Sequence, residues 1–502
     1  MDISSAMSKF GFGHRDTRHI VIDHEGELWL AMAPQAIGGF LAMGMSGLPG
    51  TLRIEPLEGG APVPFTYTAT ESILELTAKS GAVVRFAVDA PAQALRISGS
   101  GAFRLNGVSP AMRVSTLNTA EGVAINSGSN HYFFKILKGK VTFDDSWVLN
   151  EFRSATPVID IEPEGGLFEI LAYDLPEDAM PIAPTGTFDD CVAAVEADFE
   201  AFTGTLVDVP SEWDDVKRAI AYPLWLCHRF LDAKYEVVVE NKYNSKNTDA
   251  RLMAIAAMAF KDPRRAVEMI TAYPPDMPPV AGVAAAALLD EELLNDSRGE
   301  IYKVYAALEA IASKCRNERA TDKDGLSFYA YRFESGAGSS PEFFKAGEPV
   351  LAPDLNAYLA ISCEVAGRLA RMEYDDGAAQ KWEAHASRLL RMLIADLWDG
   401  ENFVGKNAYT GEASAPDEFL SLVPIILGNR LPQSIISKLA AKINAGNANS
   451  AVGFLLAGGL FDAGEKVAAA SIALSALSTV RSGGVSCPFY GASLLALAHK
   501  VL

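Results

Sequence analysis

The chain has 502 residues, of which 49% are hydrophobic and 21% charged, and its formal net charge is −20. This composition is typical of a globular protein with a large core and excludes a disordered chain. We expect neither nucleic acid nor membrane as a partner, because the acidic excess repels anionic surfaces. Five widely spaced cysteines lack a Cys-x-x-Cys pair, and the first ten residues lack a secretory pattern, so we expect a cytoplasmic protein with reduced thiols.

The first part of the chain has the texture of short strands. Between residue 18 and about 175, apolar or alternating runs recur, and Gly, Pro, Asn and Ser separate them. The clearest runs are 18–23, 72–77, 82–88 and 131–137. Many short strands with turns between them predict an antiparallel β-sandwich, which we assign to residues 1–187.

Helical spacing replaces this pattern near residue 188. Val192, Val195, Phe199 and Phe202 recur at steps of three and four, which predicts a linker helix within 188–210. Further periodic runs follow over 250–260, 264–272, 301–314, 355–372, 378–397, 434–443, 451–461 and 466–480. Their Ala and Gly content favours close helix packing. We predict an (α/α)6 toroid of helical hairpins over 211–502, although composition alone also allows a helical solenoid.

One loop carries the most specific signal in the chain. The run Asp324–Pro341 reads D-G-L-S-F-Y-A-Y-R-F-E-S-G-A-G-S-S-P. It resembles the signature loop of trehalase-like, six-hairpin glycosidases near glycoside hydrolase families 37 and 63. In those families the loop reads roughly D-G-L…E-S-G-W-D-N-S-P, and its Asp is the general acid. Here Ala337 replaces the Trp and Gly338 replaces that Asp.

The resemblance extends over residues 215 to about 500 and implies further site residues. Asp249 matches an Asp that contacts sugar hydroxyls, although an Asp at this position also caps a helix well. Asp354 and Asn356 lie in an A-P-D-L-N-A run similar to the family's V-D-L-N-A, which opens a helix at the barrel mouth; a cap and polar helix start is the alternative. Trp398 and the helix expected over 417–428 match structural parts of the toroid.

A second departure from the family pattern lies near the C-terminal end. The run 484–491 falls where the family commonly has F-Y-E, whose Glu activates the hydrolytic water, and Gly491 stands at that Glu. We expect Tyr490 beside it to contact substrate. Inverting hydrolysis needs an acid and a second carboxylate about 6.5–9.5 Å away. If both alignments hold, the chain lacks both at their usual places.

Neighbouring residues can supply the missing chemistry. Glu334 is the candidate acid, with Asp249 or Asp354 as base or substrate anchor, and Tyr331 is a candidate for proton transfer. Arg332 can hold an anionic group, or pair with a nearby acid. Tyr329 and Phe333 are expected to pack in the core.

A polar run before the Asp249 helix adds two candidates for substrate contact, Glu240 and Asn247, although a solvated loop is the commoner outcome. His14, His19 and His24 do not form a zinc pattern, and no phosphate loop follows a strand, so we expect no metal and no cofactor.

Three functions remain open on the sequence. The first is a glycosidase-like enzyme that acts on a small α-linked sugar or sugar derivative by acid/base chemistry. The second is a repurposed barrel that catalyses elimination, isomerisation or cyclisation of a non-sugar or uronate substrate. The third is a non-catalytic pseudo-enzyme. The expected partner is a small molecule, by resemblance a carbohydrate, and the sequence leaves the oligomeric state open.

Overall fold

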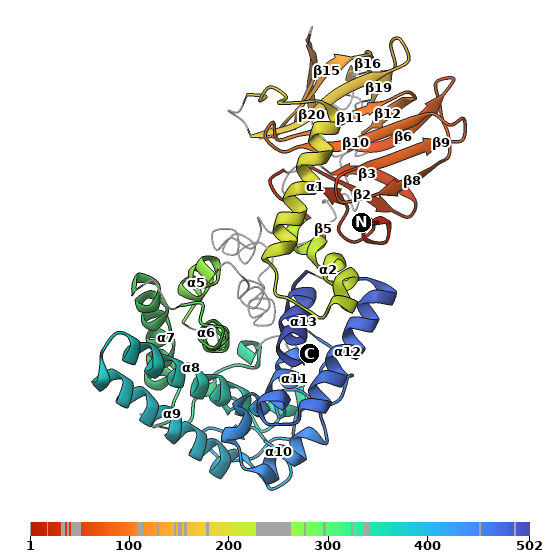
Figure 1. Ribbon diagram of the computed structural model, residues 1–502. Helices are drawn as coiled ribbons and strands as arrows, with labels where there is room; N and C mark the ends of the chain where they lie inside the picture. Colours follow the sequence, from red (N-terminus) through yellow and green to blue (C-terminus); the bar gives the residue numbers. More distant parts are fainter. Residues whose placement is uncertain are drawn as a thin grey trace. The chain divides into compact units, whose positions relative to one another are not determined.

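A computed structural model describes residues 2–17, 19–31, 36–37, 40–41, 52–107, 114–119, 121–127, 130–144, 147–148, 153–154, 158–176, 180–226, 263–275, 278–294, 298–322, 325–335, 341–450, 453–485 and 488–502. The chain divides into two compact units (Figure 1). The first comprises Met1–Gly204 and Ala221–Phe230, and the second Thr205–Ile220 and Leu231–Leu502. The domain boundaries predicted from the sequence stay predictions, because the two units are defined only by which residues contact one another. None of the described helices is long and apolar enough to cross a membrane.

The first unit contains two eight-stranded antiparallel sheets. One sheet has the order β1-β2-β3-β6-β12-β19-β16, with β7 paired to β6; its strands are Phe12–Gly13, Ile20–His24, Glu27–Ala31, Leu52–Glu58, Ala102–Asn106, Val158–Glu162, Lys140–Asp144 and Ala61–Pro62. The other has the order β13-β14-β15-β20-β11-β10-β9-β8; its strands are Val114–Thr119, Gly122–Ser127, Asn130–Lys138, Phe168–Pro176, Ala94–Gly99, Val83–Asp89, Leu74–Ala78 and Phe65–Ala69.

Aromatic side chains from both sheets form the core of this unit. Phe103 of β12 lies 5.2 Å from Phe168 of β20 and 6.4 Å from Phe86 of β10, measured between ring centroids, and all three rings are buried. Strand β9 alternates buried and half-buried residues, as expected when one face of a sheet packs against a core. The two sheets therefore pack face to face, which confirms the predicted antiparallel sandwich.

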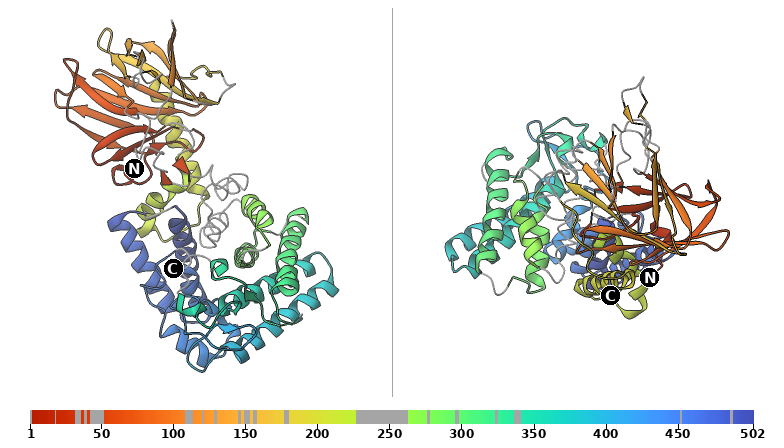
Figure 2. Two further views of the ribbon diagram at one scale, coloured as in Figure 1. Left: turned by 180° about the vertical axis from the view of Figure 1, so that it is seen from behind. Right: turned by 90° about the horizontal axis from the view of Figure 1, so that it is seen from above.

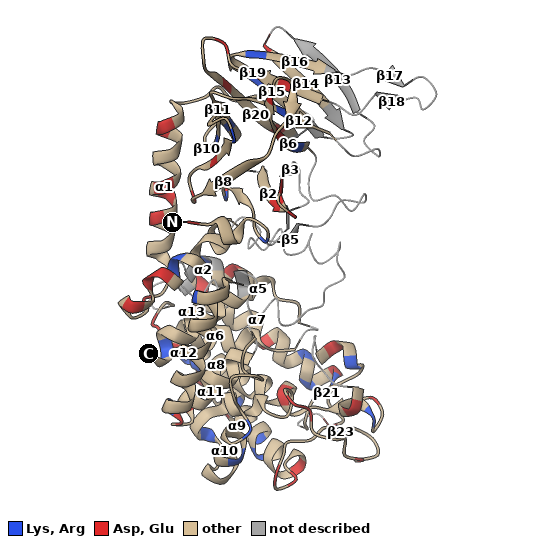
Figure 3. Cartoon of the chain, turned by 90° about the vertical axis from the view of Figure 1, so that its right-hand side faces the viewer, with Lys and Arg blue, Asp and Glu red and all other residues tan. Residues whose placement is uncertain are grey.

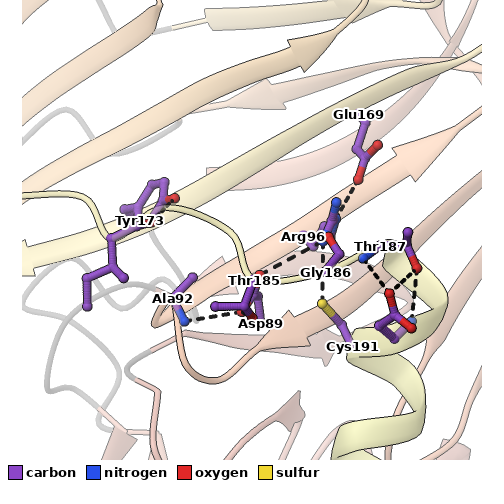
Figure 4. A network of polar contacts seen from close by, with 11 residues as sticks. Asp89, Ala92, Arg96, Glu169, Tyr173, Thr185, Gly186, Thr187 and Cys191 are labelled. Atoms are coloured by element: carbon purple, nitrogen blue, oxygen red, sulfur yellow. Dashed lines mark hydrogen bonds and ion pairs between the residues drawn. The ribbon is translucent and has the colours of Figure 1, made fainter.

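A buried polar network fixes the segment that leaves the sandwich. Arg96 of β11 donates to Glu169 of β20, to the carbonyl of Gly186 and to the sulfur of Cys191 (Figure 4). Asp89 lies 3.9 Å from the same guanidinium and accepts from the backbone N–H of Ala92. Cys191 is in the first turn of α1 (Phe188–Thr205), so Arg96 joins the sheet to the start of the predicted linker helix.

The second unit is built of helices. Its main elements are η2 (Ser211–Trp213), α2 (Asp214–Leu226), α5 (Pro263–Ala272), α6 (Ala281–Asp290), α7 (Arg298–Glu318), α8 (Pro353–Met372), α9 (Asp376–Leu397), η6 (Val423–Arg430), α10 (Gln433–Ala440), α11 (Gly453–Asp462), α12 (Lys466–Gly483) and α13 (Pro488–Val501). Helix α2 starts in this unit and ends in the first. From α5 to α13 the helices follow one another around an arc, which is visible from opposite sides (Figures 1 and 2).

Contacts and burial separate an inner from an outer layer in this arc. The elements α6, α8, η6, α11 and α13 contact one another in turn, while α9 packs on α8, and α12 packs on α11 and α13. Helix α8 is buried along nearly its whole length, whereas α9 buries residues at steps of three and four, as an outer helix does. This paired arrangement is that of the predicted toroid.

Small residues permit the close packing of the inner layer. A Cβ atom on Gly459 of α11 would lie 2.6 Å from the carbonyl oxygen of Ile425 in η6, so no larger residue fits between these elements. The glycine and alanine content of the helical runs thus has the packing role expected from the sequence.

Three details differ from the sequence expectation. The helix expected over 417–428 is wrong: this stretch is a turn followed by the 3-10 element η6, because Pro424 lacks an N–H and Gly428 adopts φ 58°. Helix α13 was not predicted. A small sheet of β21 (Phe328–Tyr329), β22 (Val350–Leu351) and β23 (Lys406–Asn407) also lies in this unit, in segments where no helix was expected.

Candidate functional site

The small sheet brings the signature loop to the start of helix α8. Strand β22 pairs with β21 on one side and β23 on the other, and α8 begins two residues after β22. Residues of this sheet and of the segments around it form a cluster of buried apolar side chains: Tyr329, Phe343, Phe344, Val350, Ala352, Leu355 and Leu420. Two segments that are distant in sequence, 325–335 and 353–356, are thereby held together (Figure 3 shows β21 and β23 at one edge of the helices).

Asp354 is a buried carboxyl group in the first turn of α8. Pro353 opens the helix, and an acid in the first turn is favourable beside the exposed backbone N–H groups. The hydroxyl of Tyr329 donates to Asp354 Oδ2 at 2.7 Å, whereas Oδ1 has no hydrogen-bond partner among the described residues. Burial raises the pKa of Asp354 to about 7, and the charge of Asp417 adds to this effect, while Tyr329 and the nearby backbone N–H groups lower it.

Tyr329 remains a proton donor in this pair. Its side chain is fully buried, and burial together with the neighbouring Asp354 raises the pKa of its hydroxyl well above the usual value. Near neutral pH, Asp354 therefore exists as a mixture of neutral and charged forms, each accepting a hydrogen bond from a neutral phenol. The expected core packing of Tyr329 is correct, and no sequence pattern indicated its hydrogen bond.

Both the oxygen and the nitrogen of the Asn356 side-chain amide make hydrogen bonds within the protein. Its Oδ1 accepts from the backbone N–H of Ser327 at 2.8 Å, and its Nδ2 donates to the carbonyls of Ser327 and Ala352, each at 2.8 Å. All of these atoms are buried. This geometry supports the structural alternative for Asn356, in which it joins the signature loop to the start of α8, over the predicted contact with substrate.

Glu334 is a partly exposed carboxylate that two donors hold in place. Its side chain is 19% exposed; Oε1 accepts from Arg319 Nη2 at 3.2 Å and Oε2 from the backbone N–H of Ala330 at 2.7 Å. Both donors stabilise negative charge. The two contacts hold the carboxylate in one position, and the role of Glu334 as general acid stays a prediction.

The side chains of Tyr331 and Arg332 are exposed to solvent. Tyr331 is 63% exposed, and Phe333 is 75% exposed, so the expected core packing of Phe333 is wrong. The backbone turns into a 3-10 helix at Arg332–Ser335 instead of remaining extended, which directs these side chains outward. The guanidinium of Arg332 lies over the ring of Phe333 at 5.1 Å, and its backbone N–H donates to Glu348.

The C-terminal part of the predicted site lies on α13. The hydroxyl of Tyr490 donates to Asn449 Oδ1 at 2.6 Å, and its ring packs on Phe454 of α11. Gly491 is buried, and a Cβ atom there would lie 2.7 Å from Ile220 Cγ2. The space around position 491 is therefore filled. The correspondence between Gly491 and the glutamate of the family stays a prediction.

Several predicted residues lie outside the described part of the chain. These are Glu240, Asn247 and Asp249, and also Ala337 and Gly338 of the signature loop. Their assignments stay predictions. In the part that the structure describes, no group of three or more His, Cys, Asp or Glu side chains is arranged to hold a metal ion.

Sequence reasoning did not identify three contacts that shape this site. Tyr329 binds Asp354, Arg319 binds Glu334, and Glu348 fixes the backbone of Arg332. The segment 325–335 carried the signal, but each partner is 15 or more residues away in sequence along a turning backbone. No local pattern specifies such pairs.

Comparisons with known proteins agree with this architecture. Residues 211–454 match the model of the mannosylglycerate hydrolase MGH1-like glycoside hydrolase domain. A family GH92 α-mannosidase from Bacteroides thetaiotaomicron, solved with mannoimidazole, is similar with a TM-score of 0.55 and 10% identity, over 98% of this chain and 83% of the other.

The GH63 mannosylglycerate hydrolase from Thermus thermophilus, solved with glucose, matches with a TM-score of 0.43 and 16% identity, over 52% of this chain and 98% of the other. A comparison with curated proteins gives no match. The chain thus has a β-sandwich followed by an (α/α)6 toroid, and it resembles the six-hairpin glycosidases, with the sequence similarity located in residues 211–454.

Proposed function

We propose that the helical unit acts on a small α-linked sugar or sugar derivative by acid/base chemistry. The observation that carries the proposal is the match of residues 211–454 to a glycoside hydrolase domain, because the segments 325–335 and 353–356 both lie in this range. Three buried free thiols, Cys191, Cys315 and Cys363, agree with the reducing, cytoplasmic setting that we include in the proposal.

The geometry supports Glu334 as the carboxylate on which this chemistry depends. The Glu334 side chain is 19% exposed and can reach a ligand, whereas Asp354 is only 1% exposed. Arg319 and the N–H of Ala330 hold the Glu334 carboxylate in one orientation, as binding of a sugar hydroxyl or activation of water requires. Asp354 and Tyr329 form the buried support of the same loop. Asp249 remains the predicted partner carboxylate.

Sugar release by a Glu334→Gln variant tests this proposal. The isosteric amide keeps the size of the side chain but cannot act as a base, so we expect release from a panel of α-mannosides and α-glucosides, mannosylglycerate included, to fall at least about 100-fold, within the range of one acid–base group. Glu342→Gln is the matched control, because Glu342 is an exposed acid paired with Lys345 nearby. Equal activity of both variants would eliminate the role of Glu334.

The repurposed barrel is a second candidate with its own support. Gly491 supplies no carboxylate at the position matched to the family's glutamate, and the side chains of Ile220 and Val485 lie close around it. A wild-type protein that releases no sugar from any α-glycoside, yet converts a uronate by elimination, would favour this candidate. Sugar binding without any turnover would favour the pseudo-enzyme.

A further inference from the structure

Two turns of the helical unit place aromatic rings in solvent. The described residues include five aromatic side chains that are more than half exposed: Tyr302, Tyr331, Phe333, Tyr374 and Tyr409. Three of these, Tyr331, Phe333 and Tyr409, lie on the two turns that leave β21 and β23. Their exposed fractions are 63%, 75% and 75%. We call these three residues the aromatic patch.

The register of the small sheet places both turns on the same edge. Tyr329, Val350 and Asn407 form one row across β21, β22 and β23. Since β21 and β23 are both antiparallel to β22, they run in the same direction and leave the sheet at the same end. Tyr331 and Tyr409 each follow this row by two residues. Two strand spacings separate the rows of β21 and β23, roughly 10 Å.

Hydrogen bonds fix both turns to the segment between them. The backbone N–H of Arg332 donates to Glu348 at 2.6 Å, and the backbone N–H of Ala408 donates to the carbonyl of Pro349 at 2.9 Å. Asn407 accepts through Oδ1 from the N–H groups of Tyr409 and Thr410, each at 2.9 Å. The rings are thus exposed on ordered turns, although burial would remove apolar area from water. Large apolar groups that are exposed on fixed elements at one edge of a sheet are candidates for a binding surface.

We propose that the aromatic patch binds the remainder of a saccharide chain whose terminal α-linked unit occupies the candidate site. An aromatic face carries partial negative charge, and the C–H groups on the face of a sugar ring carry the opposite polarity. Tyr331 lies between Tyr329 and Glu334 on the same loop, so the patch is continuous in sequence with the proposed site, on which the choice of a sugar rests. Exposed Glu348 offers an acceptor for sugar hydroxyls beside the rings.

Binding of short and long saccharides by patch variants, measured at a temperature that slows turnover, tests this inference. The probes are α-linked mannohexaose and maltohexaose, compared with the methyl α-glycosides of the same sugars, in isothermal titration of the full chain at 4 °C. We expect a hexasaccharide to bind wild type at least about tenfold more tightly than the monosaccharide. The triple variant Tyr331→Ala, Phe333→Ala, Tyr409→Ala should lose this difference.

Tyr374→Ala is the matched control, because Tyr374 is 84% exposed at the end of α8. It should keep the preference for the longer chain, and both variants should keep the melting temperature of wild type, since exposed rings contribute little to packing. The inference is overturned if wild type shows no preference for the hexasaccharide, or if the triple variant retains it.

The oligomeric state of wild type and the triple variant, measured by sedimentation, provides a second test. If wild type forms dimers that the triple variant cannot form, the patch is an interface between copies, and the inference is wrong. The proposed hydrolysis is tested separately by Glu334→Gln, so a patch that binds saccharides on an inactive protein would refute the proposed function and leave the inference standing.

Discussion

Each unit contains an arginine–glutamate ion pair and a buried aspartate, and the two aspartates differ in whether a cation lies beside them. In the sandwich, Arg96 lies against both Glu169 and Asp89. In the helical unit, Arg319 pairs with Glu334, whereas Asp354 receives only a neutral phenol at Oδ2 and has no partner at Oδ1 among the described residues. The first arrangement fixes a chain segment; the second leaves one acid near its titration point and another partly open to solvent.

Removal of the central arginine of the sandwich should have the largest effect. Arg96→Met leaves Glu169 and Asp89 without their cation and the carbonyl of Gly186 without its donor. We expect the free energy of unfolding of the first unit to fall by about 3–5 kcal/mol, because unpaired buried charges are costly. Chemical denaturation followed by circular dichroism measures this loss.

Arg104→Met is the matched control for this substitution. Arg104 binds Asp160 at 2.6 and 2.8 Å, but both side chains are about a quarter exposed. We expect Arg104→Met to lower the free energy of unfolding by at most about 1 kcal/mol. An Arg96→Met loss no larger than that of Arg104→Met would contradict the structural role of the sandwich cluster.

The unbalanced acid of the helical unit predicts a pH effect. In the unfolded chain Asp354 ionises near its ordinary pKa of 3.8, while in the folded chain its pKa is about 7. Between these values the folded state binds more protons than the unfolded state, so the free energy of unfolding falls as pH rises from 4 to 7 and then levels off. The contribution is at most about 4 kcal/mol, from about three pKa units.

Urea unfolding of wild type and Asp354→Asn at pH 5, 6, 7 and 8 isolates this contribution. The variant should become less destabilised, relative to wild type, as pH rises through that window. Asp376→Asn serves as control for the loss of an exposed carboxylate, because Asp376 lies exposed in the first turn of α9. Parallel curves for Asp354→Asn would show that Asp354 keeps an ordinary pKa.

Loss of the cation at Glu334 should have a smaller effect. Arg319→Met leaves the partly buried Glu334 with the N–H of Ala330 as its remaining donor in the described contacts. We expect a loss of about 1–3 kcal/mol, since Glu334 can still reach water. Arg368→Met, which removes an exposed pair with Asp290, should cost less than about 1 kcal/mol. Thermal unfolding of the two variants compares them, and equal losses would contradict the positioning role of Arg319.

The smallest effect is expected for the phenol that supports Asp354. Tyr329→Phe removes one buried hydrogen bond, worth about 1 kcal/mol. Because that bond lowers the pKa of Asp354, its loss should extend the fall in stability to higher pH. Tyr273→Phe removes a buried bond to the backbone carbonyl of Pro278, which does not titrate, and should leave the pH dependence unchanged. The same pH series measures both variants; an unchanged profile for Tyr329→Phe would break the link between the two groups.

Local periodicity explains how much of the fold could be predicted. The run 355–372 falls within α8, 378–397 within α9, and 82–88 overlaps β10, because apolar spacing follows directly from helix and strand geometry. The stretch 417–428 has the apolar spacing of a helix, but Pro424 and the φ of Gly428 prevent one. The spacing of apolar residues in a sequence does not reveal such backbone constraints.

The site was less predictable, since it depends on pairs from distant segments. The resemblance identified Glu334 and Asp354, but the partners Arg319 and Tyr329 follow from where β21 and α8 meet. The outward direction of Phe333 depends on a single 3-10 turn, which an extended reading of the loop misses. The direction of a side chain in a loop therefore cannot be predicted without knowledge of the fold.

A crystal structure of the protein soaked with mannoimidazole or acarbose would test the central claim most directly. The account predicts that a sugar-like ring lies within hydrogen-bond distance of the Glu334 carboxylate, with Arg319 still bound to it. An inhibitor that binds elsewhere in the helical unit, with Glu334 paired only to Arg319 and Ala330, would contradict the assignment of this loop as the functional site.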